Sequence, residues 1–203
     1  EKQTTSTYIF NLFFLLFFMD LDKAIKERHT CRRFSTKNVN WKDIIKALES
    51  ARLSPLAGNI SSVRFIVVTE DEKIQELADA CQQDFIGKVD FVVVFCSDKT
   101  QVERSYGERG LIYSRQQAGA SIENFLLKIT ELGLATCWIG AFVDEQVKRI
   151  LQIPENVDVE AIFPVGYEMP PKSKQRIKPE LDKILYFNTW KNRYMEKLKT
   201  PWA

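Results

Sequence analysis

Histidine is nearly absent from this chain of 203 residues, which has His29 alone. A single imidazole argues against a Ser-His or Cys-His nucleophilic mechanism, and it leaves little from which to build a zinc site. The four cysteines show no CxxC pairing. Cys81, Cys96 and Cys137 fall in apolar periodic segments, so we expect them to be buried free thiols in a protein of the reducing cytoplasm.

A strong net charge is also missing, with 29 Lys and Arg against 27 Asp and Glu and a net charge of +2. Binding to nucleic acid without sequence preference depends on a basic field, so we expect no nucleic-acid partner. There is no GxGxxG dinucleotide fingerprint, internal repeat or low-complexity linker. A chain that is 45% hydrophobic can bury one core, and we predict a single domain over residues 19–203.

No hydrophobic run is long enough for a typical membrane-spanning helix. Residues 9–18 are almost unbroken Ile, Leu and Phe, but this is about half of the roughly 20 residues that a span needs. No small-residue cleavage site precedes Asp20. We interpret residues 1–18 as an apolar extension outside the domain, from a start site placed too early or an upstream segment. A membrane anchor is the alternative, and no membrane partner is expected.

From Met19 onward, hydrophobic periodicity predicts alternating helices and strands. Residues 89–96 (VDFVVVFC) are apolar on both faces, which indicates a central strand covered by helices on each side. The longest helical pattern, 109–132, predicts a central helix that ends at Gly133. We expect helices over 20–28, 41 to about 53, 74–81, 109–132 and 144–151, and strands over 63–69, 89–96, 135–140 and 159–166.

Single residues add local detail to these predicted helices and strands. Asn40 and Asp144 are expected helix N-caps. Gly119 costs about 1 kcal/mol relative to Ala inside a helix, so we expect another helix or backbone to approach it closely. Pro164 lacks a ladder donor and should lie near a strand end or edge. Apolar residues share one face of each of the first two helices. They are Leu21 and Ile25 on the first, and Trp41, Ile44, Ile45, Leu48 and Ala51 on the second.

Two basic clusters far apart in the sequence carry the main chemical signal. They are residues 28–32 (RHTCR) and 174–176 (KQR). Each alone is an ordinary solvated run, and the first could merely complement a helix macrodipole. If folding brings the two clusters together, they form a site for a phosphate monoester. Arg guanidinium groups would bind the phosphate with two hydrogen bonds each, and a Lys ammonium group and a hydroxyl would add further contacts.

Two further segments lie between these clusters. Residues 54–59 (SPLAGN) stop a helix, because Pro55 disfavours helical backbone before it, and Gly58 lets the chain turn or approach a ligand closely. Residues 133–142 (GLATCWIGAF) combine a helix end with a short strand. Taken alone, each segment is explained by ordinary structure.

In order and spacing, the four segments resemble the FMN-dependent nitroreductase family over residues 20–180. The family motif R-[HS]-[ST]-x-[RK] is matched at residues 28–32, and its later K-x-R at residues 174–176. The resemblance implies that the phosphate of FMN is bound by Arg28, Arg32, Lys174 and Arg176 through charge, by Thr30 through its hydroxyl and by His29 through its backbone or one ring nitrogen.

The resemblance also implies contacts to the flavin ring. The family segment S-P-S-x-x-N-x-Q-P-x-x-F lines the isoalloxazine, commonly at the subunit interface. Leu56 replaces its second Ser, and Ser61-Ser62 replaces Gln-Pro, so polar groups near the ring are lost. The G-L-G-T-x-W-x-G segment places backbone amides near flavin N5 and O4, where they would stabilise negative charge. The implied ring contacts are Ser54, Pro55, Leu56 and Asn59, and then Ile139, Gly140 and Ala141.

The resemblance implies an α+β, three-layer fold with a mostly antiparallel sheet flanked by helices. It implies an intertwined homodimer formed by the long helix and a C-terminal docking tail from about residue 180. NADH or NADPH would reduce FMN, and a nitroaromatic, quinone or flavin-type acceptor would then take the electrons in a ping-pong cycle without a catalytic side chain. The alternatives are a dehalogenase or flavin-fragmenting enzyme of the same fold, or a non-catalytic FMN-binding or sensing protein.

Overall fold

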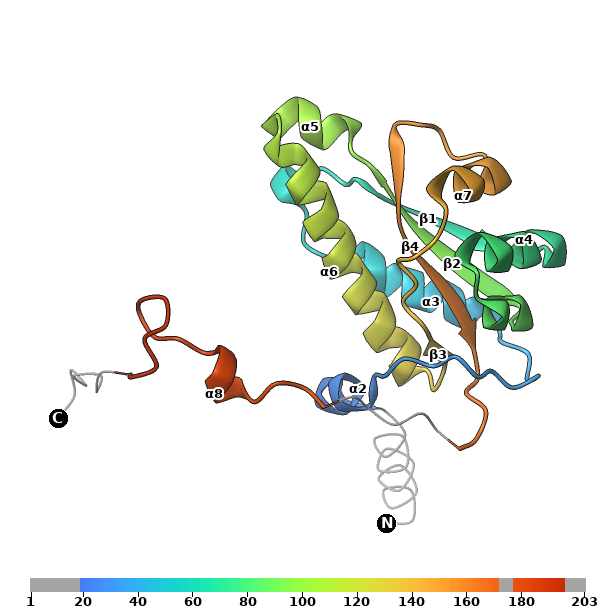
Figure 1. The fold of residues 1–203 in the computed structure, drawn as a ribbon, viewed down its shortest axis with the longest axis horizontal. Helices are drawn as coiled ribbons and strands as arrows, with labels where there is room; N and C mark the ends of the chain where they lie inside the picture. Colours follow the sequence, from blue (N-terminus) through green and yellow to red (C-terminus); the bar gives the residue numbers. More distant parts are fainter. Residues whose placement is uncertain (1–18, 172–176, 196–203) are drawn as a thin grey trace, which may run out of the picture.

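A computed structural model describes residues 19–171 and 177–195 of the chain. Within these ranges, one antiparallel sheet has helices on both faces (Figure 1). The strand order is β1-β2-β4-β3, which confirms the α+β expectation. The strands are β1 (Val63–Val68), β2 (Phe91–Asp98), β3 (Ala135–Thr136) and β4 (Val157–Gly166).

Helices α3 and α6 cover one face of the sheet, and α4 and α7 cover the other (Figure 1). The 23 residues of α6 make it the longest helix of the described chain, as its pattern predicts. The sequence pattern did not predict α5 or the two 3-10 turns. The helices and turns are α2 (Leu21–Glu27), α3 (Trp41–Arg52), η1 (Ala57–Asn59), α4 (Asp71–Cys81), η2 (Asp84–Lys88), α5 (Thr100–Tyr106), α6 (Arg109–Glu131), α7 (Asp144–Leu151) and α8 (Leu181–Ile184).

Strand β2 is buried on both faces, as the apolar run predicts. Val93 and Phe95 pack toward α3 and α6, whereas Val92 and Val94 pack toward α4 and α7. The Phe95 ring lies 5.3 Å from the Phe125 ring of α6 in an edge-on geometry. Because β2 alternates between two cores, it ties the three layers together.

The apolar stripes of α2 and α3 are only partly buried. Ile44 and Ala51 of α3 lie in the core, but Trp41 and Ile45 are exposed. Leu21 and Ile25 of α2 are 64% and 53% exposed, so the face that they share is not buried in the single chain. The physical reason is that α6 and the sheet cover only one edge of each stripe. An apolar surface is therefore left over these helices.

One expected helix cap is wrong. Val143 occupies the N-cap position of α7, and Asp144 is its first helical residue, where its carboxylate still complements the helix dipole. A Cβ built on Gly119 meets no atom within 4 Å, so nothing in the described chain approaches it closely. The expected cap at Asn40 is confirmed, since its Oδ1 accepts from the Lys42 N–H at 3.1 Å.

The predicted strand 135–140 is interrupted beside Pro164. Ile139 and Ile162 exchange both backbone hydrogen bonds, at 3.1 and 3.0 Å. The next donor on that side of β4 belongs to residue 164, and proline has no N–H. Pairing therefore breaks, leaving the two-residue β3 and an isolated bridge at Ile139. Pro164 lies near the end of β4, as expected, but β4 is not an edge strand.

The segment 177–195 runs away from the sheet and its helices (Figure 1). Its Phe187 N–H donates to the Asn192 carbonyl at 2.7 Å, so the segment forms its own turn. Trp190 is 79% exposed. The tail thus leaves large apolar side chains uncovered.

The expected extension at 1–18 lies outside the described residues, and none of the helices the structure describes is long and apolar enough to cross a membrane.

Candidate functional site

The chain that follows the first basic cluster is joined by backbone hydrogen bonds to the chain that follows β4. The Ser35 N–H donates to the Tyr167 carbonyl at 2.8 Å, and the Met169 N–H donates to the Arg33 carbonyl at 2.9 Å. A Cβ on Gly166 would lie 2.8 Å from the Phe34 ring, so a glycine allows the two segments to approach this closely. These bonds bring the first cluster beside the chain that leads to residues 172–176.

The same cluster also meets the third predicted segment. The Cys31 N–H donates to the Thr136 carbonyl at 2.9 Å, and Cys31 is fully buried. This bond places residues 28–32 beside the segment that begins at β3. Folding therefore unites two of the four segments singled out from the sequence.

The side chains of Thr30 and Arg32 are free to donate hydrogen bonds to a ligand. Both residues are exposed, and the structure gives neither side chain a hydrogen bond or ion pair with any described residue. Arg28 is partly buried, and its Nε lies 3.9 Å from Glu123 Oε1 of α6. A partly exposed pair at that distance is weak, so Arg28 keeps most of its capacity to bind an anion.

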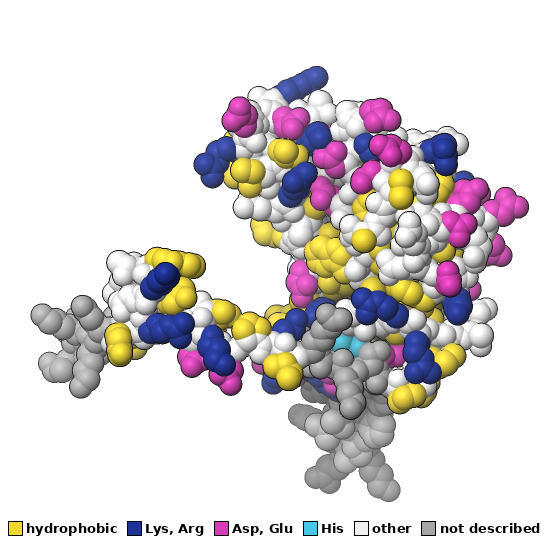
Figure 2. All heavy atoms as spheres, in the orientation of Figure 1, with side chains coloured by type: hydrophobic (Ala, Val, Ile, Leu, Met, Phe, Trp, Pro, Cys, Tyr) yellow, Lys and Arg dark blue, Asp and Glu magenta, His cyan; other side chains and the backbone are white. Residues whose placement is uncertain are grey.

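His29 is held on both sides of its ring. Its Nδ1 lies 2.7 Å from the Glu27 carbonyl, and its Nε2 lies 2.9 Å from Glu168 Oε2. The histidine (cyan) opens onto a face where Lys and Arg side chains (dark blue) gather (Figure 2). Glu168 was missed in the sequence, because no spacing rule links two residues that are 139 positions apart.

The Ile139–Ala141 segment adds backbone donors near this cluster. The Ile139 N–H is used by the Ile162 carbonyl, and Ile139 is buried. Gly140 and Ala141 are exposed, and their N–H groups have no partner among the described residues. A Cβ built on Gly140 meets nothing within 4 Å, so the space above it is open. The amides able to meet a ligand here are those of Gly140 and Ala141.

The loop at residues 54–59 has the geometry that its glycine suggests. Gly58 has φ +56° and Asn59 has φ +60°, both in the left-handed region. A Cβ on Gly58 would collide with the Tyr106 hydroxyl of α5. Ser54 is buried and Leu56 is half-buried, whereas Pro55 and Asn59 are exposed. The loop is thus fixed by its own backbone and by α5.

This loop does not join the other segments within one chain. Turn η1 lies beside α5 at one end of α6, and α2 lies at the other end (Figure 1). No hydrogen bond or ion pair links residues 54–59 to residues 28–32 in the part of the chain that the structure describes. Lys174 and Arg176 lie outside the described residues. One chain therefore assembles only part of the site expected from the sequence.

The Ser61-Ser62 replacement forms a buried polar contact with α6. Ser62 is fully buried, and its N–H and its hydroxyl each lie 3.4 Å from Gln117 Oε1. Gln117 Nε2 and Ser114 Oγ are buried without a partner in the structure. Sequence reasoning treated position 62 only as a lost flavin contact. The structure shows that Ser62 also fastens this loop to α6.

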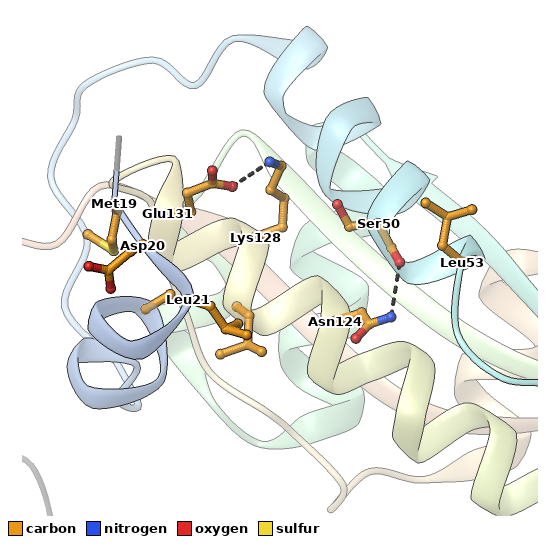
Figure 3. A pocket seen from close by; sticks show the side chains of 10 residues that line it. Met19, Asp20, Leu21, Ser50, Leu53, Asn124, Lys128 and Glu131 are labelled. Carbon is orange, nitrogen blue, oxygen red and sulfur yellow. Dashed lines mark hydrogen bonds and ion pairs between the residues drawn. The ribbon is translucent and has the colours of Figure 1, made fainter. Parts of the chain in front are cut away.

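A groove of about 350 Å³ lies between α2, α3 and α6. Figure 3 shows α2 on one side and α3 on the other, with Asn124 and Lys128 of α6 between them. Asn124 Nδ2 donates to the Ser50 carbonyl at 3.2 Å. None of the residues predicted to bind the flavin lines it, so it is a separate surface feature. Its lining consists of Met19, Asp20, Leu21, Ala24, Ser50, Leu53, Asn124, Leu127, Lys128 and Glu131.

All four cysteines are buried free thiols, which confirms the expectation for three of them. Burial raises the pKa of Cys81 to about 11 and that of Cys96 to about 12. Burial also raises the pKa of Cys31 and Cys137. A thiol that resists ionisation is a poor nucleophile, so none of these side chains is activated for covalent catalysis.

The chain belongs to the nitroreductase family, whose model matches residues 25–88 and 78–167. This is a family of oxidoreductases, and the match confirms the resemblance drawn from the four segments. The fold agrees, because the antiparallel sheet flanked by helices is also that of solved nitroreductases.

Three relatives illustrate the range of similar proteins. A protein of Archaeoglobus fulgidus named a putative NADH dehydrogenase/NAD(P)H nitroreductase is 29% identical over 71% of this chain and 83% of its own length. An iodotyrosine deiodinase of Thermotoga neapolitana is 25% identical over 81% of this chain and 96% of its own. An FMN-dependent nitroreductase of Clostridium difficile superposes with a TM-score of 0.69 and 23% identity, covering 82% of this chain and 98% of its own.

Proposed function

We propose that this protein is an FMN-dependent NAD(P)H oxidoreductase that reduces nitroaromatic, quinone or flavin-type acceptors. The observation that carries the proposal is that unused donors of two kinds lie on segments joined by the hydrogen bond from the Cys31 N–H to the Thr136 carbonyl. Thr30 and Arg32 offer a hydroxyl and a guanidinium, and Gly140 and Ala141 offer backbone amides. Arg binds phosphate oxygens as a fork, and amides favour a ring that gains negative charge.

The donor set fits FMN at both of its ends. Arg28, Thr30 and Arg32 would hold the phosphate, with the Gly140 and Ala141 amides directed to the isoalloxazine. When bound, FMN would supply the hydride and electron transfer, which this chain's own side chains do not offer. Lys174 and Arg176 would add two cations to the phosphate site in this proposal.

A complete site requires a second copy of the chain. Because residues 54–59 lie away from residues 28–32 in one chain, we place the loop of one protomer over the flavin of its partner. The exposed Leu21, Ile25 and Trp190 support this homodimer, since large apolar side chains left in water favour association. The partner loop would contribute Ser54, Pro55, Leu56 and Asn59. Residues 19–203 would form one domain, whose tail docks on the partner.

The proposal places the protein in the cytoplasm, because its four buried thiols suit a reducing compartment. The electron donor is NADH or NADPH, and the acceptor is a small molecule. Reductive dehalogenation of a phenol is a second candidate, supported by the similarity to an iodotyrosine deiodinase along most of both chains. Both activities would use the same flavin site.

The visible absorbance spectrum of the purified protein is the first test. We expect a flavin spectrum with about one FMN per chain, released by heat and identified by chromatography. Oxidation of NADH or NADPH with a nitroaromatic or quinone would then establish turnover, and halide release from iodotyrosine would indicate dehalogenation. A colourless protein that takes up no added FMN would overturn the proposal, whereas bound FMN without turnover would indicate a binding or sensing protein.

A further inference from the structure

His29 and Glu168 form an ion pair next to the proposed phosphate site. The His29 Nε2 lies 2.9 Å from Glu168 Oε2, and the Glu168 side chain is only 8% exposed. The opposite ring nitrogen lies 2.7 Å from the Glu27 carbonyl. A carbonyl and a carboxylate both accept hydrogen bonds, so a ring that makes both contacts donates from both nitrogens and carries a positive charge.

The pair joins two segments that the sequence separates. His29 lies inside the first basic cluster, between Arg28 and Thr30. Glu168 follows β4, forms a backbone bridge with Phe34 and shortly precedes residues 172–176, which include the second cluster. The side-chain pair therefore fixes the first cluster to the chain that leads to the second.

The ion pair also changes the electrostatics of the proposed phosphate site. An unpaired carboxylate on this face would repel a phosphate dianion, and a nearly buried one would be costly to leave without a partner. His29 supplies the compensating charge. Because the ring is held at both nitrogens, the backbone around Thr30 is held as well, and with it the donors of Thr30 and Arg32.

We propose that the His29–Glu168 ion pair is a positioning device that orients residues 28–32 for the phosphate of FMN and neutralises the carboxylate beside it. Glu168 is a positioning residue, since it acts through His29. The inference rests on the proposed function and adds a specificity: the pair favours a flavin that carries a phosphate over riboflavin, which has none. The two ligands share their ring, so the ratio of their affinities isolates the phosphate end.

The test compares FMN and riboflavin binding to the flavin-free full chain by fluorescence titration. In His29→Gln, Glu168 loses the positive charge of the His29 ring, and we expect FMN affinity to fall about tenfold while riboflavin affinity changes little. In the double variant His29→Gln/Glu168→Gln, two amides can pair without charge, and we expect most of the lost FMN affinity to return. Lys99→Gln is the matched control, because it breaks the Lys99–Asp158 ion pair, whose atoms lie 2.9 Å apart at the far end of β4.

A general loss of folding would weaken both flavins together and would not be repaired by the second substitution. An unchanged ratio of FMN affinity to riboflavin affinity in His29→Gln, or a double variant that binds FMN no better than the single one, would overturn the inference.

A second measurement needs no flavin. His29 is the only histidine, so in a tag-free protein we expect two protected imidazole N–H signals by NMR, one of which is lost in Glu168→Gln. A wild-type chain that shows both signals and binds no flavin would refute the proposed function separately.

Discussion

At the scale of single residues, Arg32 differs from Arg28 in what its guanidinium already contacts. Arg28 lies near Glu123 of α6, whereas Arg32 has no ion-pair partner among the described residues. A free guanidinium gives its full charge to an incoming anion. Arg32 is therefore the side chain on which the phosphate assignment can be tested most directly.

We expect Arg32→Ala to weaken FMN binding at least tenfold, because a hydrogen bond to a charged group contributes about 1.5–3 kcal/mol. Arg28→Ala should weaken it in the same direction. Isothermal titration of the flavin-free protein measures both losses. Arg104→Ala, on α5 and outside the four segments, is the control and should bind like the wild type. Wild-type affinity in Arg32→Ala would refute the assignment.

Cys96 makes folding sensitive to alkaline pH. Burial raises its pKa from 9.0 to about 12, so the folded state favours the neutral thiol. The resulting stabilisation is complete below pH 9 and is lost as the pH rises from 9 toward 12. By pH 10 the loss amounts to about 1.4 kcal/mol, from the free energy of one pKa unit.

Urea unfolding between pH 7 and pH 10, with reductant present, measures this loss. We expect the free energy of unfolding to fall more steeply in the wild type than in Cys96→Ala, where that thiol no longer titrates. Both proteins share every other titrating group, so the difference between their slopes belongs to Cys96. Parallel slopes would contradict the prediction.

At the scale of elements, α6 contains two glycines in opposite surroundings. A Cβ on Gly119 meets no atom within 4 Å, whereas a Cβ on Gly110 would lie 2.5 Å from the Glu103 Cα of α5. We expect Gly119→Ala to raise the free energy of unfolding by up to about 1 kcal/mol, because alanine is the better helix former. Gly110→Ala should lower it. Denaturant midpoints of both variants test this pair, and a destabilised Gly119→Ala would place an unseen neighbour at that position.

Strand β3 shows how one element limits another. Residues 135–140 have a plausible strand pattern, yet pairing depends on donors supplied by β4. Pro164 has no backbone N–H to donate to the neighbouring strand. The Thr136 hydroxyl donates a hydrogen bond to the Pro164 carbonyl at 2.7 Å. The chain beyond β3 rejoins β4 only at the Ile139–Ile162 bridge, and after this bridge the N–H groups of Gly140 and Ala141 have no partner among the described residues.

At the scale of the whole molecule, apolar side chains of α2, α3 and the extended tail are exposed in the single chain. The groove between α2, α3 and α6 adjoins this apolar surface (Figure 3). If a second copy covers this surface, dimerisation and flavin binding should depend on each other, because in the proposed site residues 54–59 would contact the flavin of the partner. Dimer and flavin should then be lost together.

We expect Ile25→Asp to shift the protein from dimer to monomer and to reduce bound FMN, because a carboxylate would be buried in the interface. Light scattering coupled to size-exclusion chromatography measures the mass, and absorbance measures the flavin. Gln146→Asp, on exposed α7 and the other face of the sheet, should change neither. A wild-type monomer with full FMN occupancy would contradict the prediction.

Local pattern predicted most of the elements and the order of the site segments. The two-sided apolar run of β2, the long stripe of α6 and the turn at Gly58 depend on residues near one another in the chain, where periodicity and backbone sterics act. The match of residues 28–32 to the family motif could also be read directly. The sequence by itself therefore determined the family, the α+β architecture and the candidate phosphate cluster.

Only the tertiary structure decided which of these residues meet. It joined Cys31 to Thr136 and His29 to Glu168, and it left residues 54–59 at the other end of α6. The sequence placed Leu21 and Ile25 on one face of their helix, but only the structure shows that they stay exposed, because neighbouring elements cover one edge of the helix. Contacts between distant segments depend on how elements pack, and packing is a property of the assembled layers rather than of any one segment.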